Sequence, residues 1–576
     1  MTQTFVPGAW PGRAWIAAGA ATLGTIAIPA VWLLNTSTGN LREELKVLQP
    51  WSLDACVLLG LLIGVCLLHT IPRDVYKREI PPMAMLTALG VALTVFAAPR
   101  TNRIFYDEQI YQGIAQNIAD VRLAQVCNDG SVEYGRLRCA AGEYNKQPYA
   151  YPHALSLAYR LVGVHVSTAF AVNAAAMGLT ICAVYLLVFL LFRDRDAALF
   201  AGLLIALTPE QLLWSATAAV EPSASLALVV SLLCAAHYLR AGGWLALGAT
   251  VVSAAYAVQF RPESLLILPV LGFMAWPRLR HELEQPAGWW AASLFLCLVA
   301  VHTAHLFAVR NVEWGAVGPR FSIRYIEANL RANGWFYLYD ERFPGSFMAL
   351  AFVGLFSTRQ RREALTIAKY FVLFFTIDLV FYAGSYNYGA DVRYSLMTYP
   401  PIAVLGGLGA AQLARVIARF GSRLRTGWGA PLGTGVAARA LIVTALLFQF
   451  LWYAPVVRAT TEEAWAARAD VRFAQAFASA IPRNAFVLTH NPSMFHLWGV
   501  NAGQMSRAIS NPAYVRFLTE RYGGGLYLHW NFWCNVQDPV QRELCSKALT
   551  IGTAEVLAEY RERDQSFAFY RMKIAN

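Results

Sequence analysis

The stretch MAMLTALGVALTVFAAPRTNRIFYDEQIYQGIAQNIAD, residues 83–120, places an apolar run directly before a polar segment with aromatic side chains. The first part, residues 83–99, carries no charge and is typical of a membrane-spanning helix. The second part has an apolar side chain at every fourth position from Tyr106 to Ile118, which predicts an amphipathic helix lying along the membrane surface. Asp107 and Glu108 stand at the N-terminal end of that helix.

The two adjacent acids have a structural explanation and a chemical one. Acids in the first turn of a helix are stabilised by the helix dipole, so they can simply favour the helix start. Helix capping does not require two acids at a hydrophobic boundary, however. In a water-poor pocket a carboxylate is a better base, because desolvation raises its proton affinity. We therefore treat Asp107 and Glu108 as candidate catalytic acids.

The composition indicates a polytopic membrane protein with some soluble mass. Of 576 residues, 57% are hydrophobic and 14% are charged, against about 25% charged in ordinary soluble domains. The net charge of +12 comes largely from arginines in short connections between apolar runs, which is the positive-inside pattern of membrane proteins. We therefore expect no nucleic-acid partner.

The apolar runs predict an all-α polytopic membrane protein with about 13 transmembrane helices. Basic connections then fall on one side, which we assign to the cytoplasm, with the N-terminus inside and the C-terminus outside. The first run, 15–34, is long enough to span and lacks a clear cleavage site. We expect a transmembrane catalytic domain, 1–454. Its long outer loops are 99–165, 310–345 and 385–395.

The tail, residues 455–576, is less apolar and predicts a small α/β extracytoplasmic domain. The segment AWAARADVRFAQAFASAI (464–481) has the period of an amphipathic helix, and NAFVLTH (484–490) is typical of a buried strand. A glycine turn leads into an alternating strand in YGGGLYLHWNFW (522–533).

Nine cysteines divide into two groups. Five stand in apolar runs, where cysteine is a small core residue. The other four form two local pairs, Cys127 with Cys139 and Cys534 with Cys545, in segments expected to face outside. Disulfides persist in such compartments, so we expect both pairs to be bridged; buried free thiols are the alternative.

Further charged residues occur in the segments expected at the outer face. Lys146 precedes a span, where it is either an interfacial lysine or an anion ligand. Glu221 precedes Pro222 and is either a helix cap or a second functional acid. Two later segments add the remaining candidates: Arg261, Glu263, Asp391, Arg393 and Tyr394. Arginine suits bidentate phosphate recognition, so cations and acids on one face together suggest group transfer from a lipid phosphate.

The order of these motifs resembles that of the polytopic GT-C glycosyltransferases. The likeness spans about residues 80–410 and is greatest to family 39, with the protein O-mannosyltransferases and the lipid A aminoarabinose transferase. The matching residues are Asp107-Glu108-Tyr111, Lys146-Pro148, Glu221, Arg261-Pro262-Glu263 and Arg393-Tyr394-Pro400.

The resemblance implies a GT-C core with an outer-face active site and inverting transfer from a polyprenyl-phosphate sugar. It implies that Asp107 is the general base or orients the acceptor, that Lys146 and Arg393 hold the donor phosphate, and that Glu221 is a secondary acid. The sequence departs from the family by two extra N-terminal helices, by K-Q-P at 146–148 instead of K-P-P, and by the cysteine-bearing insertion 127–139. These departures leave the acceptor open among an envelope glycan, a glycolipid and a protein.

Two other function classes follow from particular features. Asp378, an acid inside an apolar run, favours a transporter or a lipid-linked sugar flippase. A non-catalytic scaffold would make the outer acids and cations dispensable. His302 and His305, one helical turn apart, are expected to pack together instead of binding a metal. We expect no cofactor, regard a divalent metal as improbable, and find no nucleotide-binding fingerprint. The Ala- and Arg-rich composition favours a bacterial plasma membrane.

Overall fold

The structure is a computed structural model that describes residues 12–68, 73–313, 318–387, 389–424, 434–459 and 464–574. The basic segments 73–79 and 415–425 lie partly outside the described side chains. The chain forms two compact units. The helical unit comprises Met1–Pro99, Ala174–Ala216 and Val220–Ala459, and the sheet unit comprises Arg100–Asn173, Thr217–Ala219 and Thr460–Asn576.

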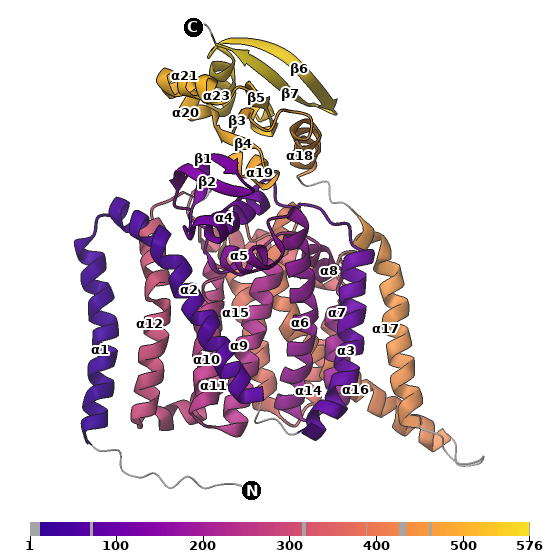
Figure 1. The fold of residues 1–576 in the computed structure, drawn as a ribbon. Helices are drawn as coiled ribbons and strands as arrows, with labels where there is room; N and C mark the ends of the chain where they lie inside the picture. The colour runs from indigo at the N-terminus through magenta and orange to yellow at the C-terminus, as the bar shows by residue number, and fades with distance from the viewer. Residues whose placement is uncertain are drawn as a thin grey trace. The chain divides into compact units, whose positions relative to one another are not determined.

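The helical unit is built from helices, many of them long (Figure 1). In the order of the chain they are α1 (Gly12–Asn35), α2 (Thr38–Leu68), α3 (Arg73–Phe96), α6 (Val166–Phe192, whose first turns belong to the sheet unit), α7 (Arg195–Ala206), α8 (Pro209–Ser215), α9 (Glu221–Ala241), α10 (Trp244–Ala257), η1 (Pro262–Leu266), α11 (Ile267–Leu283), α12 (Pro286–Val309), η2 (Ile323–Tyr325), α13 (Ile326–Leu338), α14 (Gly345–Ser357), α15 (Arg361–Val380), η3 (Gly389–Thr398), α16 (Tyr399–Leu424) and α17 (Thr434–Arg458).

Among the described residues, eight helices are long and apolar enough to cross a membrane. A ninth span results if α7 and α8, bent by 60° at their break, are counted as one. The helices α10 and α14 are apolar but shorter. The expected all-α polytopic fold is therefore confirmed, whereas the expected count of about 13 spans is not. The difference lies in the short apolar helices, which are shorter than a lone span requires.

Small residues allow the helices of this unit to approach closely. A Cβ atom on Gly354 of α14 would collide with the carbonyl oxygen of Leu405 on α16, and one on Gly409 would collide with that of Leu350. Close backbone contact through glycine is a common way to pack helices where lipid removes the hydrophobic driving force.

The sheet unit is built around a seven-stranded mixed sheet in the order β2-β1-β4-β3-β5-β7-β6. The strands are β1 (Val126–Glu133), β2 (Arg136–Glu143), β3 (Phe486–Thr489), β4 (Asn501–Gln504), β5 (Leu526–Trp530), β6 (Thr553–Glu562) and β7 (Gln565–Lys573). The helices are α4 (Asp107–Val121), α5 (Ala150–Val162), α18 (Trp465–Ala478), α19 (Pro492–Leu497), α20 (Met505–Ser510), α21 (Pro512–Arg521), α22 (Phe532–Asn535) and α23 (Pro539–Leu549). The expected helix in 464–481 and the strands in 484–490 and 522–533 are confirmed.

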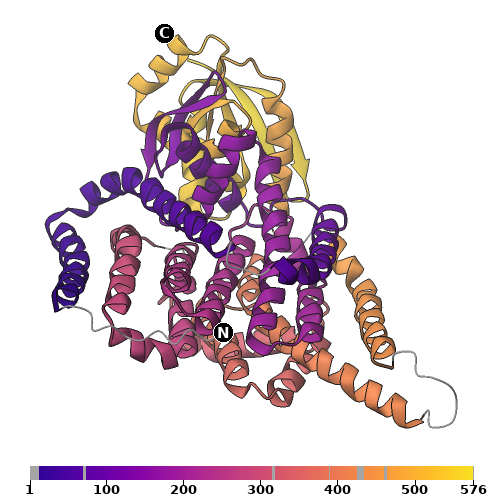
Figure 2. The same cartoon turned by 60° about the horizontal axis from the view of Figure 1, so that its bottom comes forward.

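The sheet combines two distant parts of the chain. The β1–β2 hairpin lies beside the C-terminal strands in Figure 2, where β1 pairs antiparallel with β4 through Asp129–Gly503 and Gly130–Ala502. The backbone N–H of Val132 also donates to Asn501 Oδ1 at 2.9 Å, across 369 residues. The insertion near Cys127 and Cys139 thus completes the sheet of the C-terminal domain.

The helix expected after residue 106 is confirmed as α4, but its burial differs from the prediction. Ten of the eleven residues from Glu108 to Ile118, all except Ile110, are buried, including the polar Gln112 and Gln116. The helix contacts α5, α19 and both strands of the hairpin within the sheet unit. It is therefore an enclosed helix and not one with a single buried face.

Candidate functional site

A buried carboxylate joins two arginines in the helical unit. Glu221, the first residue of α9, is fully buried, and its Oε1 atom accepts from Arg261 Nη1 and lies 3.0 Å from Arg393 Nε. Both guanidinium groups are largely buried, with 12% side-chain exposure each. The Oε2 atom of Glu221 has no hydrogen-bond partner among the described residues. A buried carboxylate is stabilised by such cations, because an unpaired charge in this environment is costly.

Three further side chains complete this Glu221 cluster. Glu263 accepts from Arg261 Nε, and Asp391 Oδ1 lies 3.1 Å from Arg393 Nη1. Both guanidinium groups lie over the ring of Tyr394, with their Cζ atoms 4.9 Å and 4.5 Å from its centroid. The structure thus brings together six residues singled out in the sequence: Glu221, Arg261, Glu263, Asp391, Arg393 and Tyr394.

Chain geometry explains why these residues meet. Glu221 opens α9, Arg261 immediately precedes η1, and Arg393 lies in η3 just before α16. All are therefore at helix ends, where polar side chains leave the apolar stretches. The sequence leaves Glu221 as a helix cap before Pro222 or as a second functional acid. In the structure Glu221 is the first residue of α9, after the N-cap Val220, and it also forms ion pairs with both arginines.

Asp378 lies in the last turn of α15, not in the middle of that helix. It is buried, its Oδ2 accepts from Tyr386 Oη at 2.7 Å, and it interacts electrostatically with Arg261 and Glu263. Its side-chain hydrogen bond is therefore to Tyr386, and the charges of Arg261 and Glu263 act on it from nearby. His302 and His305 are buried and stacked, with ring centroids 5.6 Å apart, as expected of a packed pair.

The two adjacent acids lie in the sheet unit and have different surroundings. Asp107, the first residue of α4, is half-buried. Glu108 is fully buried: its Oε1 accepts from the backbone N–H groups of Arg103 and Ile104 at 2.5 and 3.0 Å, and its Oε2 from that of Ala218 at 2.8 Å. Burial raises the pKa of Glu108 to about 7, while these backbone donors oppose the rise. Glu108 therefore anchors segments 103–104 and 217–219, and its expected catalytic role stays a prediction.

The other candidates of the first outer loop lie in the same unit. Tyr111 on α4 is buried and packs edge-on against Tyr151 of α5, with centroids 5.9 Å apart. Lys146 is half-buried in the segment before α5. Asn173 donates to the carbonyls of Thr217 and Ala219 at 2.8 and 2.7 Å, so that the short 217–219 segment is fixed from two sides.

A buried polar network, not predicted from the sequence, holds Tyr106, the residue before Asp107. The Tyr106 hydroxyl donates to Asp470 Oδ2, and His529 Nε2 lies 2.8 Å from Asp470 Oδ1. The imidazole of His529 also contacts Thr489 Oγ1 through Nδ1 at 3.2 Å. Asp470 and His529 are fully buried, and Tyr106 is 4% exposed. We call this the Tyr106–Asp470–His529 network.

Two features of the sequence are consistent with a buried polar network but do not identify its members. Asp470 is an acid on the buried face of a helix expected to be amphipathic, and His529 stands within an expected strand. A buried acid needs a donor, but the partner, Tyr106, is 364 residues away and could not be chosen from local patterns.

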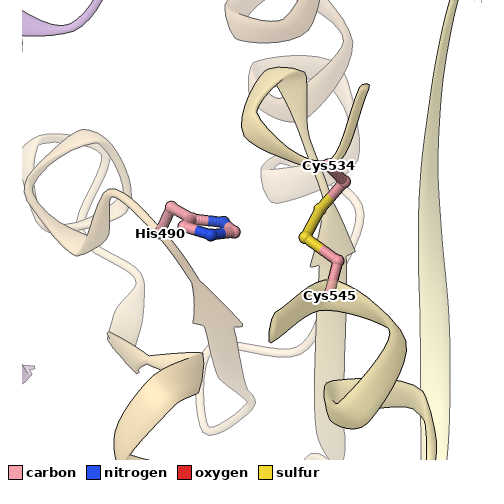
Figure 3. Close-up of side chains that lie close together, drawn as sticks. All are labelled: His490, Cys534 and Cys545. Atoms are coloured by element: carbon pink, nitrogen blue, oxygen red, sulfur yellow. A yellow bond between two sulfur atoms is a disulfide. The ribbon is translucent and has the colours of Figure 1, made fainter. Parts of the chain in front are cut away.

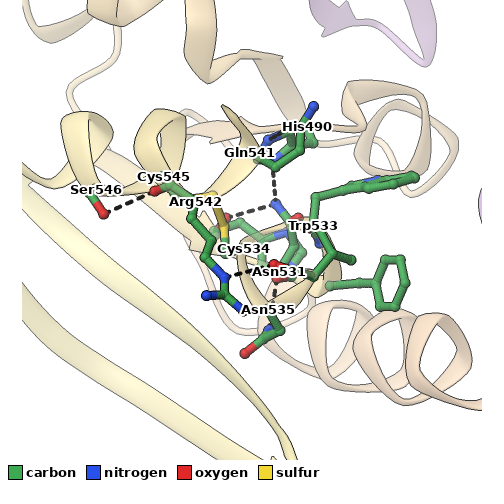
Figure 4. Close-up of a disulfide and its surroundings, with 12 residues drawn as sticks. His490, Asn531, Trp533, Cys534, Asn535, Gln541, Arg542, Cys545 and Ser546 are labelled. Atoms are coloured by element: carbon green, nitrogen blue, oxygen red, sulfur yellow. Dashed lines mark hydrogen bonds between the residues drawn. A yellow bond between two sulfur atoms is a disulfide. The ribbon is translucent and has the colours of Figure 1, made fainter. Parts of the chain in front are cut away.

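Both predicted disulfides, Cys127–Cys139 and Cys534–Cys545, are present in the sheet unit. The ring of His490 points toward the Cys534–Cys545 bridge (Figure 3). Among the described residues, these three form the one group of His, Cys, Asp or Glu side chains close enough to hold a metal ion. The two sulfur atoms are bonded to each other, however, which leaves His490 as the ligand. Its ring nitrogens contact Gln541 and Asn531 at 3.0 and 3.1 Å (Figure 4).

Known proteins share the architecture of this chain. A family model described as dolichyl-phosphate-mannose-protein mannosyltransferase matches residues 146–305. The crystal structure of ArnT from Cupriavidus metallidurans bound to undecaprenyl phosphate has a TM-score of 0.54 at 13% identity, covering 85% of this chain and 97% of that one. Its apo state gives 0.52, with the same identity and coverage. The chain resembles the GT-C glycosyltransferases of family 39.

Other comparisons add little to this GT-C assignment. The Archaeoglobus fulgidus oligosaccharyltransferase tethered with an acceptor peptide has a TM-score of 0.47 at 11% identity, covering 87% of this chain and 75% of that one, which is too low to support an argument. No curated protein sequence matches the chain significantly. The predicted GT-C fold is therefore confirmed, and the chain is a multi-pass membrane protein.

Proposed function

We propose that this protein transfers a sugar from a polyprenyl-phosphate-linked donor to an acceptor hydroxyl, with inversion, on the outer face of a bacterial plasma membrane. The observation that carries the proposal is the Glu221 cluster, where two buried arginines meet at a helix-end site. Paired guanidinium groups suit a phosphate that gains charge as it leaves. The fold of ArnT, which was crystallised with undecaprenyl phosphate, supports the same donor class.

The proposed reaction is a direct displacement. The acceptor oxygen attacks the anomeric carbon, the bond from that carbon to the phosphate oxygen breaks, and the acceptor proton passes to Asp107. Polyprenyl phosphate leaves with the bonding electrons, and Lys146 and Arg393 stabilise its charge. Glu221 acts near the sugar or acceptor, and Tyr111, Arg261, Glu263 and Tyr394 serve substrate binding.

The topology belongs to the same proposal. The N-terminus lies in the cytoplasm, and the C-terminal domain, 455–576, lies outside with the outer loops of the domain 1–454. The acceptor is an envelope glycan, a glycolipid or a protein. A metal is not needed in this scheme, because the leaving phosphate is stabilised by cationic side chains.

The test uses cells that lack the native gene and carry wild type, Asp107→Asn or Asp120→Asn at matched levels. Asp120 is the control because it lies on the same helix and accepts from the backbone N–H of Leu137, a bond that asparagine retains. Mass spectrometry of polyprenyl-phosphate sugars and envelope glycans should show donor accumulation and loss of one sugar from a glycan in Asp107→Asn only. Equal profiles in deleted and complemented cells would refute the proposed transferase function. Full turnover by Asp107→Asn would refute only the assignment of Asp107 as the general base.

A flippase built on Asp378 is the second candidate, favoured by the burial of that acid in the last turn of α15. It predicts that Asp378→Asn changes the sidedness of a lipid-linked sugar without changing transfer in detergent. Loss of transfer in detergent would instead favour Asp378 as part of the Glu221 cluster.

A further inference from the structure

A groove of ≈ 580 Å³ opens within the sheet unit. Its walls come from α4, the β1–β2 hairpin, the turn before α6, α18 and α19, and its polar and aromatic lining is formed by Gln116, His165, Gln475, Ser479, His496 and Trp498. No Asp, Glu, Lys or Arg lines it among the described residues. The size falls in the range typical of small-molecule sites.

Two buried acceptor atoms belong to residues of this groove. Gln116 Oε1 and His496 Nδ1 have no hydrogen-bond partner in the described part of the chain, although both side chains are at least 98% buried. Gln116 uses its amide Nε2 to reach the carbonyl of His496 at 3.4 Å. An unsatisfied buried polar atom is unfavourable, so each of these two atoms favours a ligand that supplies a donor.

The protonation of His496 fixes what such a ligand must offer. Its Nε2 lies 3.0 Å from the carbonyl oxygen of Ala502, which can only accept, so Nε2 carries the proton and Nδ1 presents a lone pair. Burial lowers the pKa of His496 to about 4, which keeps the ring neutral. Both unpaired atoms are therefore neutral acceptors that need hydroxyl or N–H donors.

We infer that this groove binds a neutral saccharide. Sugar hydroxyls donate to amide oxygen and imidazole nitrogen, and the indole of Trp498 offers an apolar face with a polar edge to the C–H face of a sugar ring. A phosphate or an acidic polymer would find no cation in this lining. The uncharged lining thus favours a neutral glycan over a charged ligand.

The position of Gln116 on α4 connects the groove to the proposed reaction. Gln116 follows Asp107 by nine residues on the same helix, a rise of about 13 Å at 1.5 Å per residue. An oligosaccharide can therefore bind in the groove while its end approaches the first turn of α4. This extension of the inference rests on the proposed function, and it narrows the acceptor to a glycan with neutral units next to the reacting sugar.

Binding can be measured without transfer. The purified full-length protein in detergent is applied to an array of neutral and acidic oligosaccharides, and the best neutral ligand is titrated calorimetrically. Trp498→Ala removes the aromatic face, whereas Ser479→Trp blocks the groove from an exposed position without removing a buried side chain. Phe517→Ala, an exposed aromatic of the same unit outside the groove, is the control.

We expect at least tenfold weaker binding in Trp498→Ala and Ser479→Trp and unchanged binding in Phe517→Ala. Binding of acidic glycans alone, no binding of any neutral glycan, or binding that persists in both groove variants would overturn the inference. If these failures occur while gene deletion still changes a glycan, the groove assignment fails and the transferase stands. If glycan binding is lost as expected but deletion changes no glycan, the transferase fails instead.

Discussion

The Tyr106–Asp470–His529 network predicts that one hydroxyl stabilises the start of α4. Tyr106→Phe removes the donor to Asp470 Oδ2 and leaves the aromatic ring, which packs in a buried cluster with Val487, Phe495 and Phe569. Asp470 then keeps His529 on Oδ1 and the backbone N–H of Phe532 at 3.3 Å from Oδ2. The substitution therefore tests the hydrogen bond with little change in packing.

The expected magnitude follows from the charge and burial of the acceptor. A hydrogen bond to a charged group contributes about 1.5–3 kcal/mol. Because each 1.36 kcal/mol changes an equilibrium constant tenfold, local opening around α4 and β5 should become roughly 10- to 150-fold more frequent. The first turn of α4, which carries Asp107, depends directly on the bond from Ile110 N to the Tyr106 carbonyl at 3.0 Å.

Hydrogen exchange of the full-length protein measures this opening. Amides in α4 and residues 526–533 should exchange faster in Tyr106→Phe by the factor given above. Tyr134→Phe is the matched control, since Tyr134 is fully exposed at the hairpin turn of the same unit. Equal exchange rates in the two variants would show that the network does not hold α4, and would refute the reasoning.

Three further outcomes are expected. Arg393→Lys should lower kcat/KM by roughly 10- to 150-fold, because an ammonium cannot match a guanidinium that contacts Glu221, Asp391 and Tyr394 at once; the half-exposed Arg415→Lys is the control in the transfer assay. Glu108 binds a proton more tightly in the folded state than in the unfolded state, so the free energy of unfolding should fall as pH rises from about 4.5 to about 7. Thermal denaturation across this pH range should show the fall in wild type but not in Glu108→Gln. Gly113→Ala should destabilise the sheet unit because its Cβ would lie 2.6 Å from Ser493 Oγ, and Ser493→Gly should restore part of the loss in a double-mutant cycle.

Features with a local signal were predicted well. Tyr106 to Ile118 has the helical period, and α4 begins at Asp107. The cysteine pairs are 12 and 11 residues apart in sequence and are bridged. Short apolar runs were predicted less well, because α10 and α14 are too short to be recognised as spans by length alone. A length criterion cannot separate a short crossing from a buried or bent helix.

The sequence by itself determined the membrane class, the helix start at Asp107, and the set of acids and cations at the ends of apolar runs. Hydropathy and periodicity carry this information because each depends on neighbouring residues. Only the tertiary structure decided that Glu221 forms ion pairs with both Arg261 and Arg393, and that Glu108 accepts hydrogen bonds from three backbone N–H groups. It also decided that the hairpin of the first loop completes the C-terminal sheet. Apart from the bonds of Glu108 to the nearby Arg103 and Ile104, these pairings join residues far apart in the sequence, such as Ala218 and Glu108 across 110 positions. Local periodicity does not indicate which distant partner a buried polar group will contact.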